Sequence, residues 1–131
     1  MASLKEVIMS DDFKKEKHVP VIELPAHVKK GEKIKVTVSV GKEIPHPNTT
    51  EHHISWIELY FLPTGEKYPY VIGKYEFQAH GASTQGPNTS TIYSDPEVTV
   101  TFRTEKSGTV IAYSHCNIHG LWSSQVELKL E

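Results

Sequence analysis

The stretch Ile34-Lys35-Val36-Thr37-Val38-Ser39-Val40 alternates apolar and polar side chains without interruption. Successive side chains of a β-strand point to opposite faces, so a period of two predicts a strand with one buried face. The β-branched valines and isoleucine also favour an extended backbone. This segment predicts that the protein is built from strands.

Similar short runs lie on both sides of this strand. They predict further strands over residues 18–24, 54–62, 68–77, 97–103, 108–115 and 125–130. Turn signals such as Lys30-Gly31-Glu32 and Pro63-Thr64-Gly65 separate them. Only the first dozen or so residues, with Leu4, Val7 and Ile8 at helical spacing, suggest a short helix. The pattern predicts an all-β protein, an antiparallel sandwich or barrel.

Composition limits the kinds of partner. The 131 residues carry 14 basic and 16 acidic side chains, a net charge of −2, so the broad basic field of a nucleic-acid-binding protein is not expected. The start of the chain lacks the apolar core of a signal peptide, and no stretch approaches the ~20 apolar residues of a membrane span. An unpaired cysteine agrees with a reducing compartment. We expect one domain over residues 1–131, located in the cytoplasm, with neither nucleic acid nor membrane as a partner.

Cys116 is the only cysteine, and it lies in the run Cys116-Asn117-Ile118-His119-Gly120. A single thiol forms no internal disulfide, and structural zinc sites usually need two to four cysteines. Cys116 is therefore inert packing, a nucleophile, or one metal ligand among histidines. The third interpretation is favoured because Gly120 permits a turn after a strand, which lets Cys116 and His119 bind one ion.

Eight histidines are many for one small domain, and their positions distinguish them. His46 stands between two prolines, whose fixed φ angles stiffen the backbone of a long turn-rich loop over residues 41–51. His52 and His53 open a predicted strand, so at most one of them is expected at a given metal. Considered by itself, His18 is interpreted as a surface histidine. The remaining three have no comparable neighbouring residues in the sequence and are interpreted as structural: His27, His80 and His115.

The candidate ligands are one thiolate and up to four imidazoles, from Cys116, His119, His46, His52 and His18. A tetrahedral structural zinc has no use for five ligands. Imidazoles with one soft thiolate are more typical of redox-active iron or copper. Spacing alone does not choose between those two metals.

The residues around these candidates resemble a known family, the single-iron superoxide reductases, also called neelaredoxins. The resemblance rests on three motifs, in the family's order and with its internal spacings: Glu16-Lys17-His18-Val19-Pro20, His46-Pro47-Asn48-Thr49-Thr50-Glu51-His52-His53-Ile54 and Cys116-Asn117-Ile118-His119-Gly120-Leu121-Trp122. Together they span most of the chain, and three separated motifs are far more specific than Cys-x-x-His alone. The family's fold is an immunoglobulin-like β-sandwich or barrel, in agreement with the strand pattern.

The resemblance also implies the roles of individual residues. It implies a mononuclear iron, Fe2+ or Fe3+, with four equatorial histidines and one axial thiolate: His18, His46, His52, His119 and Cys116. His53 would face elsewhere, which agrees with strand alternation. Glu16 matches the family's carboxylate that occupies the sixth position in the ferric state. Lys17 matches its lysine beside the open position.

The activity implied by the resemblance is one-electron reduction of superoxide to hydrogen peroxide. Some members of the family carry an additional N-terminal four-cysteine iron centre, for which this chain has no cysteines. Its electrons are therefore expected from another protein, and the family implies rubredoxin or a similar carrier. Related single-iron proteins form homotetramers, so we expect a homotetramer by resemblance.

Two other functions compete with this interpretation. A blue-copper electron carrier is also a small β-sandwich with histidine and cysteine ligands, but its axial methionine usually follows closely after the last histidine. The only methionines here are Met1 and Met9, and copper leaves His18 and His52 without a role. An immunoglobulin-like interaction module with incidental histidines does not explain three linked motifs.

Overall fold

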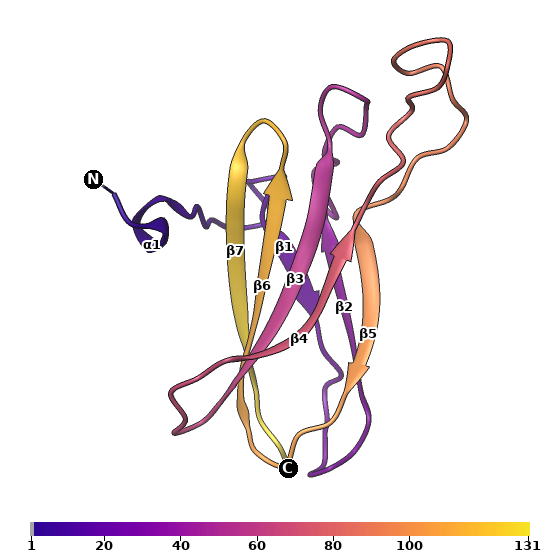
Figure 1. The fold of residues 1–131 in the computed structure, drawn as a ribbon. Coiled ribbons are helices and arrows are strands. Elements are labelled where there is room, and N and C mark those ends of the chain that lie inside the picture. The colour runs from indigo at the N-terminus through magenta and orange to yellow at the C-terminus, as the bar shows by residue number, and fades with distance from the viewer. Residues whose placement is uncertain (1) are drawn as a thin grey trace.

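The computed structural model describes residues 2–131 and contains two facing antiparallel sheets (Figure 1). The first sheet has the strand order β1-β2-β5, formed by β1 (Pro20–Glu23), β2 (Ile34–Val40) and β5 (Glu97–Phe102). The second has the order β4-β3-β6-β7, formed by β3 (Ile54–Pro63), β4 (Tyr70–Glu76), β6 (Gly108–Cys116) and β7 (Gly120–Leu128). The prediction of an all-β antiparallel sandwich is confirmed.

The core lies between the two sheets and follows the alternation of the sequence. Val36 and Val38 of β2 are fully buried, as are Ile57 and Leu59 of β3, and all four belong to one hydrophobic cluster. Lys35 of β2 is exposed on the other face. Burial of a large aliphatic side chain contributes about 1.5–3 kcal/mol, so the inward-facing residues of these two strands hold the sheets together.

β7, the second strand of the β6–β7 hairpin, begins earlier than the sequence pattern indicates. We expected the last strand to start at Gln125, whereas β7 starts at Gly120, which pairs directly with Cys116. Gly120 has a φ of 79°, a left-handed conformation that suits glycine and permits a tight reversal. The turn between the strands therefore contains only Asn117, Ile118 and His119.

The N-terminal segment adds one short helix and a strand-like contact. α1 (Leu4–Val7) confirms the expected helical segment, although it is only four residues long. After α1 the chain joins the edge of β7, where Met9 N donates to Leu121 O and Ser123 N donates to Met9 O. Within residues 2–131, no helix combines the length and apolar character that a membrane crossing requires.

Three irregular segments gather at one end of the sandwich, opposite the C-terminus (Figure 1). They are the β2–β3 loop (residues 41–53), the β4–β5 excursion (residues 77–96) and the β6–β7 turn. A rigid β scaffold commonly presents functional residues on such loops. Six histidines lie in these three segments or shortly before β1. Five of them are candidate metal ligands or stand next to one in the sequence: His18, His46, His52, His53 and His119.

Candidate metal centre

The β6–β7 turn places a thiol beside an imidazole. Cys116 ends β6 with its side chain fully buried, and His119 lies on the exposed turn. The backbone N–H of His119 donates to Cys116 Sγ at 3.3 Å, and His119 Nδ1 lies 3.7 Å from the same sulfur. Trp122 Nε1 donates to the His119 carbonyl at 3.2 Å, which holds the turn closed. The short hairpin therefore brings both predicted ligands to one point.

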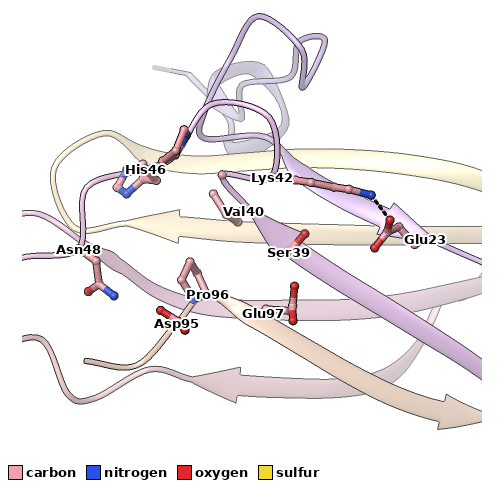
Figure 2. A pocket seen from close by; sticks show the side chains of 11 residues that line it. Glu23, Ser39, Val40, Lys42, His46, Asn48, Asp95, Pro96 and Glu97 are labelled. Carbon is pink, nitrogen blue, oxygen red and sulfur yellow. Dashed lines mark hydrogen bonds and ion pairs between the residues drawn. The ribbon is translucent and has the colours of Figure 1, made fainter. Parts of the chain in front are cut away.

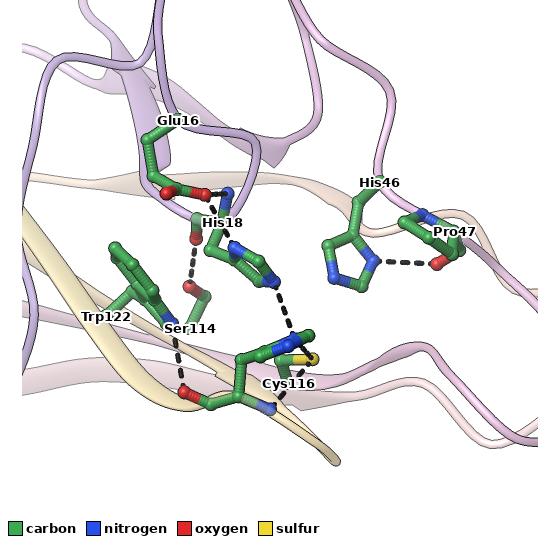
Figure 3. Close-up of polar contacts among 8 residues, drawn as sticks. Glu16, His18, His46, Pro47, Ser114, Cys116 and Trp122 are labelled. Carbon is green, nitrogen blue, oxygen red and sulfur yellow. Dashed lines mark hydrogen bonds and ion pairs between the residues drawn. The ribbon is translucent and has the colours of Figure 1, made fainter.

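His18 comes from the other end of the chain and is fixed on three sides (Figure 3). Ser114 Oγ donates to its carbonyl at 2.9 Å, and the Trp122 ring stacks on its imidazole with centroids 4.9 Å apart. Glu16 Oε1 lies 2.5 Å from His18 Nδ1 and accepts a second hydrogen bond from its backbone N–H at 3.0 Å. The opposite nitrogen, His18 Nε2, is consequently directed at His119 Nδ1, 3.1 Å away.

The β2–β3 loop supplies two further imidazoles. His52 precedes β3, and its backbone N–H donates to Thr49 Oγ1 at 3.0 Å in a local turn. His46 Nδ1 donates to the Pro47 carbonyl at 2.7 Å, so its Nε2 is the nitrogen left free to bind another group. In Figure 3 the His46 ring faces His18, and the centroids of these two rings are 4.8 Å apart.

Four of the predicted ligands form one compact group. The ligand atoms of His18, His52, Cys116 and His119 all lie within 4.8 Å of one another. His46 lies just outside this group, beside both His18 and His52. His53 does not join it, because its Nδ1 bonds Thr49 O and its ring stacks on another histidine.

Two nitrogens in this region lack any hydrogen-bond partner. Among residues 2–131, the buried side-chain nitrogen and oxygen atoms without a partner are His46 Nε2 and His52 Nε2. Burying a polar atom without a partner costs about 1–3 kcal/mol, so such atoms are rare unless a bound group satisfies them. The donor set of imidazoles with one thiolate suits a transition metal. The residues present therefore fit a resident metal ion.

Glu16 and Lys17 occupy different positions around the group. The Glu16 carboxylate lies against the far nitrogen of His18, where it sets the tautomer and orientation of that ring. Lys17 is half-buried, and its positive charge contributes to lowering the pKa of His46 and of His52. A cation is thus held close to the imidazoles without an ion pair of its own among the described residues.

Burial favours the neutral form of two of the imidazoles, His46 and His52. It lowers the pKa of His46 to about 4, and nearby positive charges add to this effect. Burial likewise lowers the pKa of His52, and the neighbouring His119 and His18 act in the same direction. Burial by itself raises the pKa of Glu16, but hydrogen bonds and the charge of His18 outweigh it, so the pKa is lowered. At neutral pH these groups have the protonation states that metal binding requires.

The low pKa of His46 predicts that the metal-free protein loses stability in mild acid. The pKa of His46 in the folded protein, about 4, lies below the ordinary value of 6.5. Between these two pH values His46 is therefore protonated in the unfolded chain and neutral in the folded one. The free energy of unfolding should fall as the pH decreases from about 6.5 to about 4. Urea unfolding of the metal-free protein at several pH values measures this slope. His46→Gln should show a shallower slope, and equal slopes in the two proteins would contradict the prediction.

An open cleft of about 480 Å³ lies on another side of the β2–β3 loop (Figure 2). His46 and Asn48 belong to the loop, and Asp95 and Pro96 lie across from them, just before β5. Lys42 spans the cleft mouth and pairs with Glu23 of β1. The loop that carries His46 is therefore not packed against β5 along this side, and its position depends on specific polar contacts.

Residues 10–125, which contain every residue of the candidate site, match the family described as Desulfoferrodoxin. This chain belongs to the desulfoferrodoxin family. It is 56% identical over 126 residues to the superoxide reductase of Pyrococcus furiosus, covering 96% of this chain and 99% of that protein. The structure of the superoxide reductase (neelaredoxin) of Archaeoglobus fulgidus in the reduced form matches with a TM-score of 0.89 and 59% identity, covering 95% of this chain and 99% of that one. A crystal structure of a Thermotoga maritima protein matches with a TM-score of 0.97 and 56% identity, covering 100% and 99% of the two chains.

In this desulfoferrodoxin-family protein, sequence reasoning missed residues that support the site. Trp122 and Ser114 hold His18, yet neither has metal-binding chemistry that would single it out. The position of Trp122 within the third motif was a usable signal. His80, interpreted as structural, is buried and bonded to the loop that carries His46. Met9, which the sequence places far from the last candidate histidine, is half exposed at the edge of β7.

Proposed function

We propose that this chain reduces superoxide to hydrogen peroxide at a mononuclear iron held by His18, His46, His52, His119 and Cys116. The observation that carries the proposal is the convergence of three imidazoles and one thiolate within 4.8 Å, in a chain 56% identical to a superoxide reductase. His46 is the fourth imidazole of the proposal, supported by its unpartnered Nε2. Glu16 and Lys17 complete the set of proposed site residues.

These five protein donors would hold the iron and would leave room for substrate at a six-coordinate ion. When bound, ferrous iron supplies one electron to superoxide, which takes up two protons and leaves as hydrogen peroxide. The chain's own residues tune this reaction. The N–H of His119 stabilises negative charge on Cys116 Sγ, and the Glu16 carboxylate strengthens His18 as a donor.

The decisive experiment measures the metal and the reaction together. Anaerobic iron quantitation should find one iron for each chain, and pulse radiolysis with superoxide should oxidise it with one hydrogen peroxide formed and no oxygen. Electron paramagnetic resonance of the oxidised protein should give a high-spin ferric signal. A copper signal would support the blue-copper alternative. Unchanged superoxide decay in the presence of the protein would contradict the proposed activity.

Lys17 is proposed to attract the superoxide anion. Its charge already influences the neighbouring imidazoles, and a cation beside a buried site accelerates the approach of an anion. Lys17→Ala should lower the bimolecular superoxide rate at low salt by about tenfold and flatten its dependence on ionic strength. Lys14→Ala, at an exposed lysine of the same segment, is the matched control and should retain the parental slope. Equal slopes in Lys17→Ala and the parent would remove the steering role.

Glu16 is proposed to act on the site in two ways. The resemblance implies that its carboxylate binds ferric iron, and in the structure the same carboxylate orients His18. Glu16→Ala should therefore change the ferric absorption spectrum and weaken Fe2+ binding by about 10-fold. An unchanged ferric spectrum with weakened Fe2+ binding would limit Glu16 to the orientation of His18, and Glu16→Gln should restore part of that binding.

The donor and the assembly are also proposals. The single cysteine of the sequence supports an external electron source, and rubredoxin or a similar carrier is the donor implied by the resemblance. Exposed apolar side chains, such as Leu4 and Val7 of α1, support self-association, for which we propose a homotetramer. Sedimentation at several concentrations and reduction by purified rubredoxin test these two proposals.

A further inference from the structure

The β2–β3 loop carries two proposed ligands but has no strand or helix of its own between residues 41 and 53. One side of it borders the open cleft of Figure 2. Some other part of the chain must therefore keep His46 and His52 in place. Several polar contacts of this loop lead to the β4–β5 excursion, where its partners are Asn88, Ser94 and His80. Of these three, His80 is the one whose side chain is buried.

His80 is buried, with 7% of its surface exposed, and it is anchored to the scaffold. Its Nε2 lies 2.5 Å from the Phe77 carbonyl. Phe77 in turn donates its backbone N–H to Ser55 of β3 at 2.8 Å, and His80 also forms a β-bridge with Tyr93. The backbone on either side of His80 thus connects this residue to the four-stranded sheet independently of the β2–β3 loop.

The other nitrogen of His80 binds the loop next to His46. His80 Nδ1 lies 2.8 Å from Asn48 Oδ1, while Asn48 Nδ2 donates to the Ser94 carbonyl at 3.0 Å. Because a carbonyl can only accept, the Ser94 contact fixes the amide with its oxygen toward His80, and His80 Nδ1 is the donor. Only Pro47 separates Asn48 from His46, and its ring restricts the backbone between them.

The same residue also contacts the loop next to His52. Thr50 Oγ1 donates to the His80 carbonyl at 2.7 Å, and the His53 ring stacks on the His80 ring with centroids 3.6 Å apart and planes 3° apart. Thr50 lies two residues before His52, and His53 follows it directly. His80 therefore touches the neighbours of both proposed ligands and neither ligand itself.

We infer that His80 is a positioning residue, which through its Nδ1–H bond to Asn48 holds His46 in the orientation needed to bind iron. The inference rests on the proposed function, since it concerns the iron of that site. Partners outside the ligand shell that orient metal ligands typically alter metal affinity 10–100-fold. The bond to Asn48 is one step further from the metal, so an effect of about tenfold is expected, at the lower end of that range.

Two substitutions of His80 separate positioning from packing. In His80→Asn the amide nitrogen takes the place of Nδ1 and can still donate to Asn48. In His80→Gln the amide nitrogen takes the place of Nε2 and can donate to Phe77 but not to Asn48. Both variants lose the ring and its stack on His53, so they should lose similar thermal stability. Ile34→Val, at the far end of β2 from the loop, is a control for stability loss alone.

Anaerobic competition for Fe2+ against a chelator of known affinity measures the effect, and circular dichroism measures thermal unfolding of each iron-free protein. His80→Gln should raise the Fe2+ dissociation constant about tenfold, whereas His80→Asn and Ile34→Val should stay within about threefold of the parent. Asn48→Ala should match His80→Gln, and the double variant should be no weaker than either, because both remove one interaction.

The outcomes distinguish this inference from the proposed function. Tight Fe2+ binding by the parent, with equal affinities in His80→Asn and His80→Gln, would overturn the positioning role alone. Additive losses in Asn48→Ala and His80→Gln would also overturn it. A parent chain that binds no Fe2+ would overturn the proposed function and the inference together. If His80→Gln fails to fold, Asn48→Ala with parental affinity would overturn the inference.

Discussion

Replacing Cys116 by serine should reduce the rate of superoxide reduction by at least about 100-fold. The thiolate is the one soft, anionic donor of the proposed site, and its sulfur accepts the His119 N–H. A serine hydroxyl remains protonated at neutral pH and donates far less electron density to iron. Iron quantitation, the ferric absorption spectrum and pulse radiolysis should show loss of the sulfur-to-iron charge-transfer band together with loss of activity.

Cys116 is also a fully buried member of the core, so a control for the buried hydroxyl is needed. Ala112→Ser supplies it, because Ala112 lies on the same strand and in the same core cluster. Ala112→Ser should lose stability but keep the charge-transfer band and the parental rate. Full superoxide reduction by Cys116→Ser would exclude Cys116 as an essential metal ligand. Loss of bound iron in this variant without any change in superoxide consumption would revive the interpretation of an interaction module with incidental histidines.

Replacing His52 by leucine should have opposite effects on metal binding and on stability. Loss of a proposed ligand should weaken Fe2+ binding by at least about 100-fold. In the iron-free protein, however, the substitution removes a buried nitrogen that lacks a partner. The free energy of unfolding of the iron-free protein should therefore rise by about 1 kcal/mol. Metal competition and urea unfolding of the iron-free proteins measure the two effects.

This opposite pair of effects is typical of a residue kept for function at the expense of stability. His115→Leu is the matched control, since His115 is a half-buried histidine of β6 whose Nδ1 has a partner in Ser55 Oγ. That variant should bind iron as the parent does and should gain no stability. A loss of stability in iron-free His52→Leu would show that His52 serves the fold rather than the metal.

Much of the fold could be predicted from local patterns. The alternation in Ile34–Val40 required a strand with one buried face, and β2 has those bounds. The predicted start of β7 was wrong by five residues, since the strand was expected to begin at Gln125 and begins at Gly120. The conformation of Gly120 and its pairing with Cys116 decide that boundary, and both depend on the partner strand.

The candidate site was predictable to different degrees. Cys116 and His119 could be paired from spacing, because a short turn suffices to bring them together. His18 carried no local signal, and only the resemblance of three motifs singled it out. The contacts of His80 with the β2–β3 loop were not predictable from the sequence. Its partners Asn48 and Thr50 lie 32 and 30 residues away in the chain, and His80 belongs to an irregular segment.

The sequence by itself determined the β class, the loop character of residues 41–51 and the chemical types of the ligands, because periodicity, turn residues and side-chain chemistry are local properties. Only the tertiary structure decided which nitrogens converge. His18 Nε2 and His119 Nδ1 are separated by 101 residues in the chain and by 3.1 Å in space. That distance depends on the burial of the sheets, on the Ser114 and Trp122 contacts of His18, and on the Glu16 carboxylate that turns the ring. These are interactions between strands and loops that no single stretch of sequence contains.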